Sequence, residues 1–142
     1  PGEQEINVIK SINKETFYRM FISLNNVIGV RRSGAKIIET KLSPAPTELL
    51  IHILNKDDSF TMAFRNKDAI MKKLGVELEK TPSSVYANIG KLRDAGYLIK
   101  DEDNLFVLNH ELRDIKKLVE QSIKNEKPLT FDFIFKFCMV DE

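Results

Sequence analysis

The sequence lacks the features that indicate disulfides, secretion signals and membrane spans. Cys138 is the only cysteine, which excludes a disulfide within the chain and fits a reducing compartment such as the cytoplasm. The first residues lack the basic segment and apolar run of a secretion signal, and no segment approaches the roughly 20 apolar residues of a membrane span. We therefore expect a soluble cytoplasmic protein with no membrane partner, located in the host cytoplasm if its source is viral.

Recognisable catalytic motifs are also lacking. His52 and His110 are far apart in the sequence and distant from Cys138, so no metal-ligand spacing occurs. Neither a glycine-rich phosphate loop nor a nucleophile elbow is present. These absences predict a protein that is not an enzyme and that uses no metal, cofactor or small-molecule ligand. The simplest reading of His52 is a partly buried helix residue.

The net charge favours no class of partner. The 142 residues carry 22 Lys and Arg against 21 Asp and Glu, so attraction for nucleic acid requires an uneven distribution of charge. The length and the 42% hydrophobic content suit one domain with an elaborated terminus.

The first third of the chain predicts a strand, a helix and a basic connection. Alternating apolar residues predict a short strand within 1–12. Apolar residues at helical spacing predict a helix that starts after Asn13, a capping residue, and ends at Gly29. The basic connection that follows contains a possible strand at 35–40.

The middle of the chain follows the element order of a winged helix. Thr47 is expected to cap a first helix, and 60–64 alternate as a strand. Asn66 is expected to cap a second helix that ends at Gly75.

A third helix is the best-defined element of the sequence. Thr81 is its expected cap, Pro82 suits the first helical position, and Gly96 closes it. Strands at 97–100 and 105–109 then form a hairpin. After this hairpin the pattern predicts an amphipathic helix capped by Asn109 and a Phe-rich strand near the C-terminus.

These elements predict an α+β fold, a winged helix-turn-helix with an N-terminal helical extension and a C-terminal helix plus Phe-rich β-strand. The expected parts are an extension at 1–42, a winged core at 43–109, and a helix and strand at 110–142 that pack on the core or on a partner.

The outer face of the third helix suits contact with DNA. If Val85, Ile89 and Leu92 form the buried stripe, an advance of 100° per residue turns small and polar residues outward. Hydroxyl, phenol and ammonium groups can contact phosphates and base edges, and small residues allow close approach. The expected DNA-contacting residues are Ser83, Ser84, Tyr86, Ala87 and Lys91. The alternative is an ordinary amphipathic helix with a solvated outer face.

Two basic segments extend this surface. Lys67, Lys72 and Lys73 make the second helix basic, and the second and third helices of a winged helix border the same groove. Arg31 and Arg32 could form an arm that follows the DNA backbone or enters a minor groove. For both segments the simpler reading is a solvated face or loop.

Phenylalanines alternate along the C-terminal strand at Phe131, Phe133, Phe135 and Phe137. Such a face requires burial, either under the N-terminal strand of the same chain or against a second copy. We therefore predict these residues as partner-binding and a homodimer through this strand as a candidate assembly, with intrachain burial as the alternative.

Two stretches of the sequence resemble a known family. SSVYANIGKLRDAGYLI, starting at Ser83, resembles the core of prokaryotic and phage winged-helix proteins. LFVLNHEL, Leu105 to Leu112, is similar to the hairpin return of plasmid and phage replication initiators of the RepL type. The resemblance implies binding of double-stranded DNA through the third helix and the wing, as a replication initiator or transcription regulator. The positions carried over are Ser83, Ser84, Tyr86, Ala87 and Lys91.

The tip of the predicted wing is acidic, with Asp101, Glu102 and Asp103 in a row. Phosphates repel carboxylates, so the third helix is expected to make the main DNA contacts while the tip points away or meets a basic partner. The alternative function is a winged helix used for protein–protein interaction or assembly, for example in a phage or regulatory complex.

Overall fold

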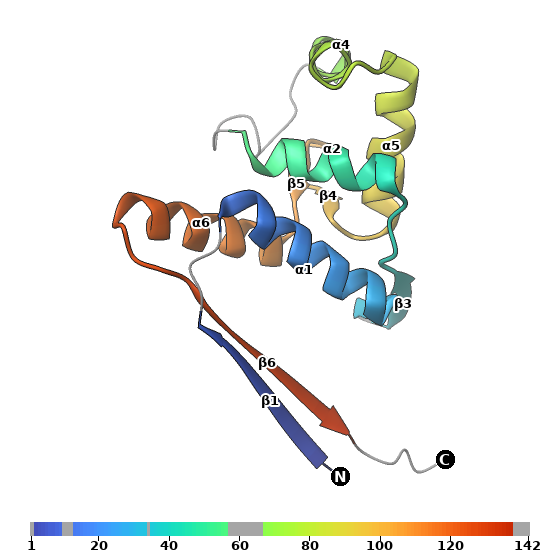
Figure 1. The fold of residues 1–142 in the computed structure, drawn as a ribbon. Helices are drawn as coiled ribbons and strands as arrows, with labels where there is room; N and C mark the ends of the chain where they lie inside the picture. Colours follow the sequence, from blue (N-terminus) through green and yellow to red (C-terminus); the bar gives the residue numbers. More distant parts are fainter. Residues whose placement is uncertain (1, 10–12, 34, 57–66, 138–142) are drawn as a thin grey trace.

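The chain combines helices with short antiparallel strands (Figure 1). The computed structural model describes residues 2–9, 13–33, 35–56 and 67–137. In these ranges the helices are α1 (Lys14–Ile28), α2 (Pro44–Leu54), α4 (Lys67–Leu78), α5 (Pro82–Asp94) and α6 (His110–Lys124). The strands are β1 (Gly2–Ile9), β2 (Val30–Ser33), β3 (Lys36–Glu39), β4 (Leu98–Lys100), β5 (Phe106–Leu108) and β6 (Thr130–Phe137). The predicted α+β class is confirmed.

Each described strand pairs with one antiparallel neighbour, β1 with β6, β2 with β3, and β4 with β5. The β1–β6 register runs from Gly2 opposite Phe137 to Ile9 opposite Thr130. Figure 1 shows this two-stranded ribbon extending away from the helices. We refer to it as the β1–β6 arm.

The hydrophobic core is centred on the C-terminal half of α2, whereas Pro44, Ala45 and Glu48 in its first half are exposed. Its most deeply buried residues are Leu49, Leu50, Ile53 and Leu54. Because these apolar side chains cover more than one side of the helix, neighbouring helices must pack around this half. On α5 the predicted stripe of Val85, Ile89 and Leu92 is buried, as expected. Burial of each such side chain contributes about 1.5–3 kcal/mol to folding.

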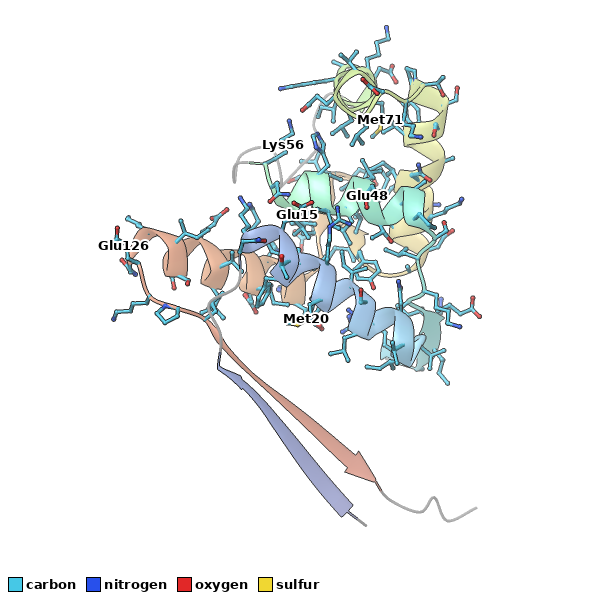
Figure 2. All side chains as sticks on the ribbon, viewed as in Figure 1. Glu15, Met20, Glu48, Lys56, Met71 and Glu126 are labelled. Atoms are coloured by element: carbon cyan, nitrogen blue, oxygen red, sulfur yellow. The ribbon has the colours of Figure 1, made fainter. Side chains whose placement is uncertain are left out.

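Arg19 ties α1 to α2 at the edge of this core. Its guanidinium donates to Glu15 at 2.9 Å and to the two carboxylate oxygens of Glu48 at 2.7 and 2.9 Å. Figure 2 shows Glu15 and Glu48 close together where the two helices approach. The hydrogen bonds from Arg19 hold the pKa of Glu48 below its usual range. Glu48 is thus an ionised carboxylate whose charge is paired with that of Arg19.

Three predicted helix starts are confirmed by their caps. The Asn13 side chain accepts a hydrogen bond from the Thr16 N–H at 2.8 Å, and Gly29 ends α1 in the left-handed conformation. The Thr81 hydroxyl accepts from the Ser84 N–H at 3.2 Å at the start of α5. The Asn109 side chain caps α6 in the same way.

The predicted start of α2 is wrong. The helix begins at Pro44, and its N-cap is Ser43 instead of Thr47. Prolines fit the first turn because those N–H groups have no partner within the helix. Thr47 lies one turn inside and donates both its N–H and its hydroxyl to the Ser43 carbonyl.

The predicted end of α4 is also wrong. Gly75 lies inside the helix, which continues to Leu78. The Lys80 N–H donates to the Gly75 carbonyl at 2.8 Å. A Cβ at position 75 would lie 2.6 Å from the Lys80 carbonyl oxygen. Glycine is therefore needed here for a close approach of the returning chain, and not to end the helix.

Some predictions fall outside the described residues, namely the strand at 60–64 and the cap at Asn66. The predicted strands at both ends of the chain and at 35–40 are confirmed as β1, β6 and β3. Across the described ranges, no helix combines the length and the apolarity required to cross a membrane.

Candidate nucleic-acid interface

The outer face of α5 is a row of small and polar side chains held in place by the packing of its inner face. Val85, Ile89 and Leu92 fix the helix against the core. On the opposite side Ser83, Ala87 and Lys91 recur every four residues and are exposed. Because four residues advance a helix by slightly more than one turn, these three form a continuous stripe. The face is narrow, lightly polar and open to close approach.

The N-terminal end of α5 lies beside a lysine-lined cleft. A cavity of about 640 Å³ is bounded by Lys72, Gly75 and Val76 of α4, by Glu79 and Lys80, and by Thr81 and Pro82 at the start of α5. A helix N-terminus carries partial positive charge and N–H groups without partners within the helix. Lysines beside that end add to the attraction for a phosphate.

Two acids of α4, Asp68 and Glu77, are engaged in contacts with other residues, whereas Glu79 lines the cleft and lowers its net positive charge. The Tyr86 hydroxyl donates to Asp68, and Glu77 accepts from Lys56 and from His52, the latter at 3.1 Å. Burial alone would raise the pKa of Glu77, but hydrogen bonds from Lys56 and His52 more than offset it and the pKa is lowered. Both carboxylates thus serve contacts between helices.

The lysines at this surface keep their charge available. Within the described part of the chain, Lys72, Lys80 and Lys91 form no ion pair. Lys72 and Lys80 flank the N-terminal end of α5, and Lys91 lies further along its outer stripe. The positive charge is therefore distributed from the N-terminal end of α5 to its last turn.

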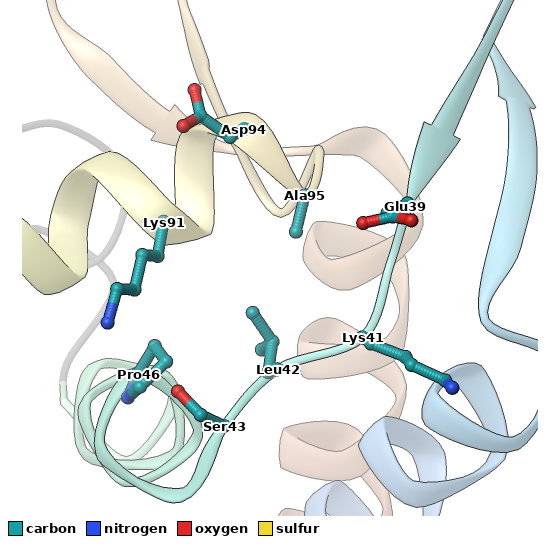
Figure 3. Close-up of a pocket in the computed structure, with 8 residues that line it drawn as sticks. All are labelled: Glu39, Lys41, Leu42, Ser43, Pro46, Lys91, Asp94 and Ala95. Atoms are coloured by element: carbon teal, nitrogen blue, oxygen red, sulfur yellow. The ribbon is translucent and has the colours of Figure 1, made fainter.

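Lys91 reaches toward α2. It lines a cavity of about 350 Å³ between α5 and the segment that leads into α2. In Figure 3 its ammonium end extends toward Pro46, whereas Glu39 lies on the opposite side of the cavity. Asp94, which lines the same cavity, lies 3.5 Å from the Arg93 guanidinium. The charge of Lys91 is not cancelled by either acid.

Tyr86 holds a different position from the other residues expected on this face. Its ring is partly buried against the core, and its hydroxyl donates to Asp68 of α4. This hydrogen bond, with some desolvation, raises the pKa of the phenol. Tyr86 thus joins α4 to α5, a role that the sequence did not predict. Ser84 is half-buried, beside the Thr81 cap.

The remaining predicted basic residues divide between β2 and α4. Arg31 lies in β2, not in a loop, and its guanidinium pairs with Glu111 of α6 at 2.9 Å. It shares a cavity with Gly96, beyond the C-terminal end of α5. Arg32 follows in β2, Lys67 begins α4, and Lys73 is exposed on that helix. Arg31 and the lysines near Lys72 thus flank opposite ends of α5.

The acidic tip of the β4–β5 hairpin stabilises its own turn through hydrogen bonds. The Asp101 carboxylate accepts hydrogen bonds from the N–H groups of Asp103 and Leu105, both at 2.9 Å. Asn104 adopts the left-handed conformation, with φ of 64°. Glu102 and Asp103 remain exposed. One carboxylate is therefore structural and two face solvent, which makes the tip a poor phosphate contact.

In the described residues no group of three or more His, Cys, Asp or Glu side chains is arranged to hold a metal ion. Comparison with known proteins finds no matching family model, no similar curated protein and no similar solved structure.

Proposed function

We propose that the protein binds double-stranded DNA with a winged helix-turn-helix formed by α2, α4, α5 and the β4–β5 hairpin. The observation that carries the proposal is the exposed stripe of Ser83, Ala87 and Lys91 on a helix whose inner face is fixed in the core. An α-helix of this kind fits the major groove, where base edges are read. The likeness to RepL-type initiators supports the same assignment, as a replication initiator-like protein or a transcription regulator.

In this proposal the lysines position the protein and α5 reads the groove. Lys72, Lys80 and Lys91 contact phosphates, which supply affinity without sequence information. Ser83 and Ala87 face the base edges. The acidic hairpin tip stays away from the backbone, because Glu102 and Asp103 are exposed and repelled by phosphates.

Charge reversal tests the proposal. Lys72→Glu with Lys91→Glu is expected to weaken binding to duplex DNA at least tenfold and to reduce the salt-dependence slope by about 2. Binding is measured by fluorescence anisotropy across a series of salt concentrations. The matched control is Lys117→Glu with Lys124→Glu, which changes the net charge equally on the exposed side of α6. Absence of binding at low salt, or an equal loss in the control, would falsify the proposal.

We also propose that two copies associate through the β1–β6 arm, which is the interaction role that the sequence left open. Phe131, Phe133, Phe135 and Phe137 occupy alternate positions and so share one face of the arm. Register places Ile6 opposite Phe133 and Val8 opposite Phe131 on that face.

A further inference from the structure

A cavity separates the inner side of α5 from the start of α2 and the end of α4. Its volume is about 450 Å³, within the range of about 300–1,000 Å³ typical of small-molecule sites. It is lined by Pro44, Ala45, Glu48 and Leu49 of α2, by Leu78 and Lys80, and by Val85 and Asn88 of α5. The lining is apolar except for three side chains.

Asn88 is the unusual member of this lining. The residue is only 7% exposed, and it interrupts the apolar stripe between Val85 and Ile89. Within the described part of the chain, no hydrogen-bond partner serves its amide. Buried side-chain amides almost always have a partner, because an unpaired one loses its hydration without replacement. The Asn88 amide atoms are not among the fully enclosed polar atoms that lack a partner, so they open onto the cavity, where a ligand with polar atoms can bond them.

The two charged side chains of the cavity, Lys80 and Glu48, differ in whether their charge is available to a ligand. Lys80 has no ion-pair partner among the described residues, so its ammonium can accept an anion. Glu48 is bound through both oxygens by Arg19, which lowers its pKa and neutralises its charge. The cavity thus combines one available cation and one amide with an apolar floor of Leu49, Leu78 and Val85.

We propose that this cavity binds a small monocarboxylate with an apolar body. Lys80 pairs with the carboxylate, Asn88 supplies a hydrogen bond, and the apolar body packs on Leu49, Leu78 and Val85. Lys80 is the one available cation among the described residues that line the cavity, which suits a ligand with a single acidic group. The sequence signal for this site is the polar Asn88 directly before Ile89, a residue of the predicted buried stripe.

A ligand at this position touches all three helices of the DNA-binding unit, so it can change the position of α5. This regulatory consequence depends on the DNA-binding function proposed above, whereas the binding itself does not. The coupling expected between two such sites is about 5- to 150-fold in affinity.

The test uses the full chain labelled with ¹⁵N and titrated with hexanoate. We expect saturable shifts of the Asn88 side-chain amide signals with a Kd of about 1 mM or tighter. Hexanamide, the neutral analogue, should bind at least tenfold more weakly, as should hexanoate to Lys80→Met. Asn88→Leu should fold normally, since it replaces an unpaired buried amide with an apolar group of similar size, and it should lose hexanoate binding.

Two results would overturn the site. One is the absence of saturable shifts, and the other is hexanoate binding that is unchanged in Asn88→Leu and Lys80→Met. DNA affinity is measured separately with and without hexanoate. If the protein binds hexanoate but does not bind DNA, the proposed function fails and the site stands. If DNA binds and hexanoate does not, the site fails and the function stands.

Discussion

Asn109 connects three segments of the chain through a single residue. Its Oδ1 accepts from the Leu112 N–H at 2.8 Å and caps α6, while its Nδ2 donates to the Gly96 carbonyl at 2.8 Å. Its backbone N–H donates to the Tyr97 carbonyl at 3.0 Å. The turn after α5 is thereby locked to the start of α6. The asparagine of LFVLNHEL thus has a structural role that is independent of any ligand.

Substitution of Asn109 separates its two side-chain roles. Asn109→Ala removes both hydrogen bonds and should lower the free energy of unfolding by about 2 kcal/mol. Asn109→Ser keeps a capping oxygen but loses the donor to Gly96, so we expect about half that loss. Urea denaturation followed by circular dichroism measures both. Equal losses in the two variants would show that the cap contributes nothing.

Residue-level prediction from sequence succeeded where the signal is local. The caps Asn13, Thr81 and Asn109 were identifiable because each bonds an N–H three residues ahead. The exposed side of α5 followed from helical geometry and the stripe at Val85. The partner of Tyr86 was not predictable, because Asp68 is distant in the sequence and only the packing of α4 on α5 brings it near.

At the scale of helices, boundaries depend on contacts that local sequence does not contain. Ser43 and Thr47 are both capable caps, and the choice of Ser43 places Pro44 in the first turn. Gly75 resembles a helix end, yet its role comes from Lys80 passing close to its Cα. Local preference indicates that a helix exists, and tertiary contact decides where it stops.

The two glycines within helices should respond oppositely to alanine. Alanine normally stabilises a helix interior by about 1 kcal/mol relative to glycine. At Gly90 an added Cβ meets nothing closer than the Arg93 side chain at 4.0 Å, so Gly90→Ala should be stabilising. At Gly75 it would lie 2.6 Å from backbone oxygen, so Gly75→Ala should destabilise by about 1–3 kcal/mol. Thermal unfolding compares the pair, and the same sign for both would refute the close-approach explanation.

Lys116 of α6 closes the C-terminal end of α2. The side chain is 3% exposed, and its ammonium donates to the Leu54 carbonyl at 2.9 Å, to the Lys56 carbonyl at 2.7 Å and to Glu120 at 2.6 Å. Carbonyls at a helix end lack partners within the helix and attract positive charge. A buried lysine therefore anchors one helix to the end of another.

Lys116→Met retains much of the apolar stem and removes the three donors. We expect the free energy of unfolding to fall by about 2–3 kcal/mol, because the carbonyls of Leu54 and Lys56 lose their charged donor. Lys117→Met, at the exposed neighbouring position, is the control and should change stability by less than about 0.5 kcal/mol. If urea denaturation gives the two variants similar free energies of unfolding, the hydrogen bonds from Lys116 to the end of α2 do not stabilise the protein.

For the whole molecule, the sequence predicted the elements better than their association. It indicated a strand near each terminus, and it left open whether the phenylalanine face meets its own chain or a second copy. The structure pairs β1 with β6 edge to edge, from Gly2 opposite Phe137 onward. Edge pairing satisfies backbone hydrogen bonds, but a two-stranded ribbon has no second layer to cover a face.

The β1–β6 arm therefore yields a prediction about assembly. If two copies pack their phenylalanine faces together, Phe133→Gln should shift full-length protein from dimer toward monomer in sedimentation equilibrium, weakening the dimer by tenfold or more. Register places residue 134 opposite Glu5, on the other face of the arm, so Ile134→Gln is the matched control and should remain dimeric. Both variants replace an apolar side chain with an amide in the same strand. If only Phe133→Gln dissociates, the cause is therefore the loss of the phenylalanine face and not a loss of strand propensity. A monomeric wild-type protein at micromolar concentration, or equal dissociation of both variants, would exclude the arm as the element that joins two copies.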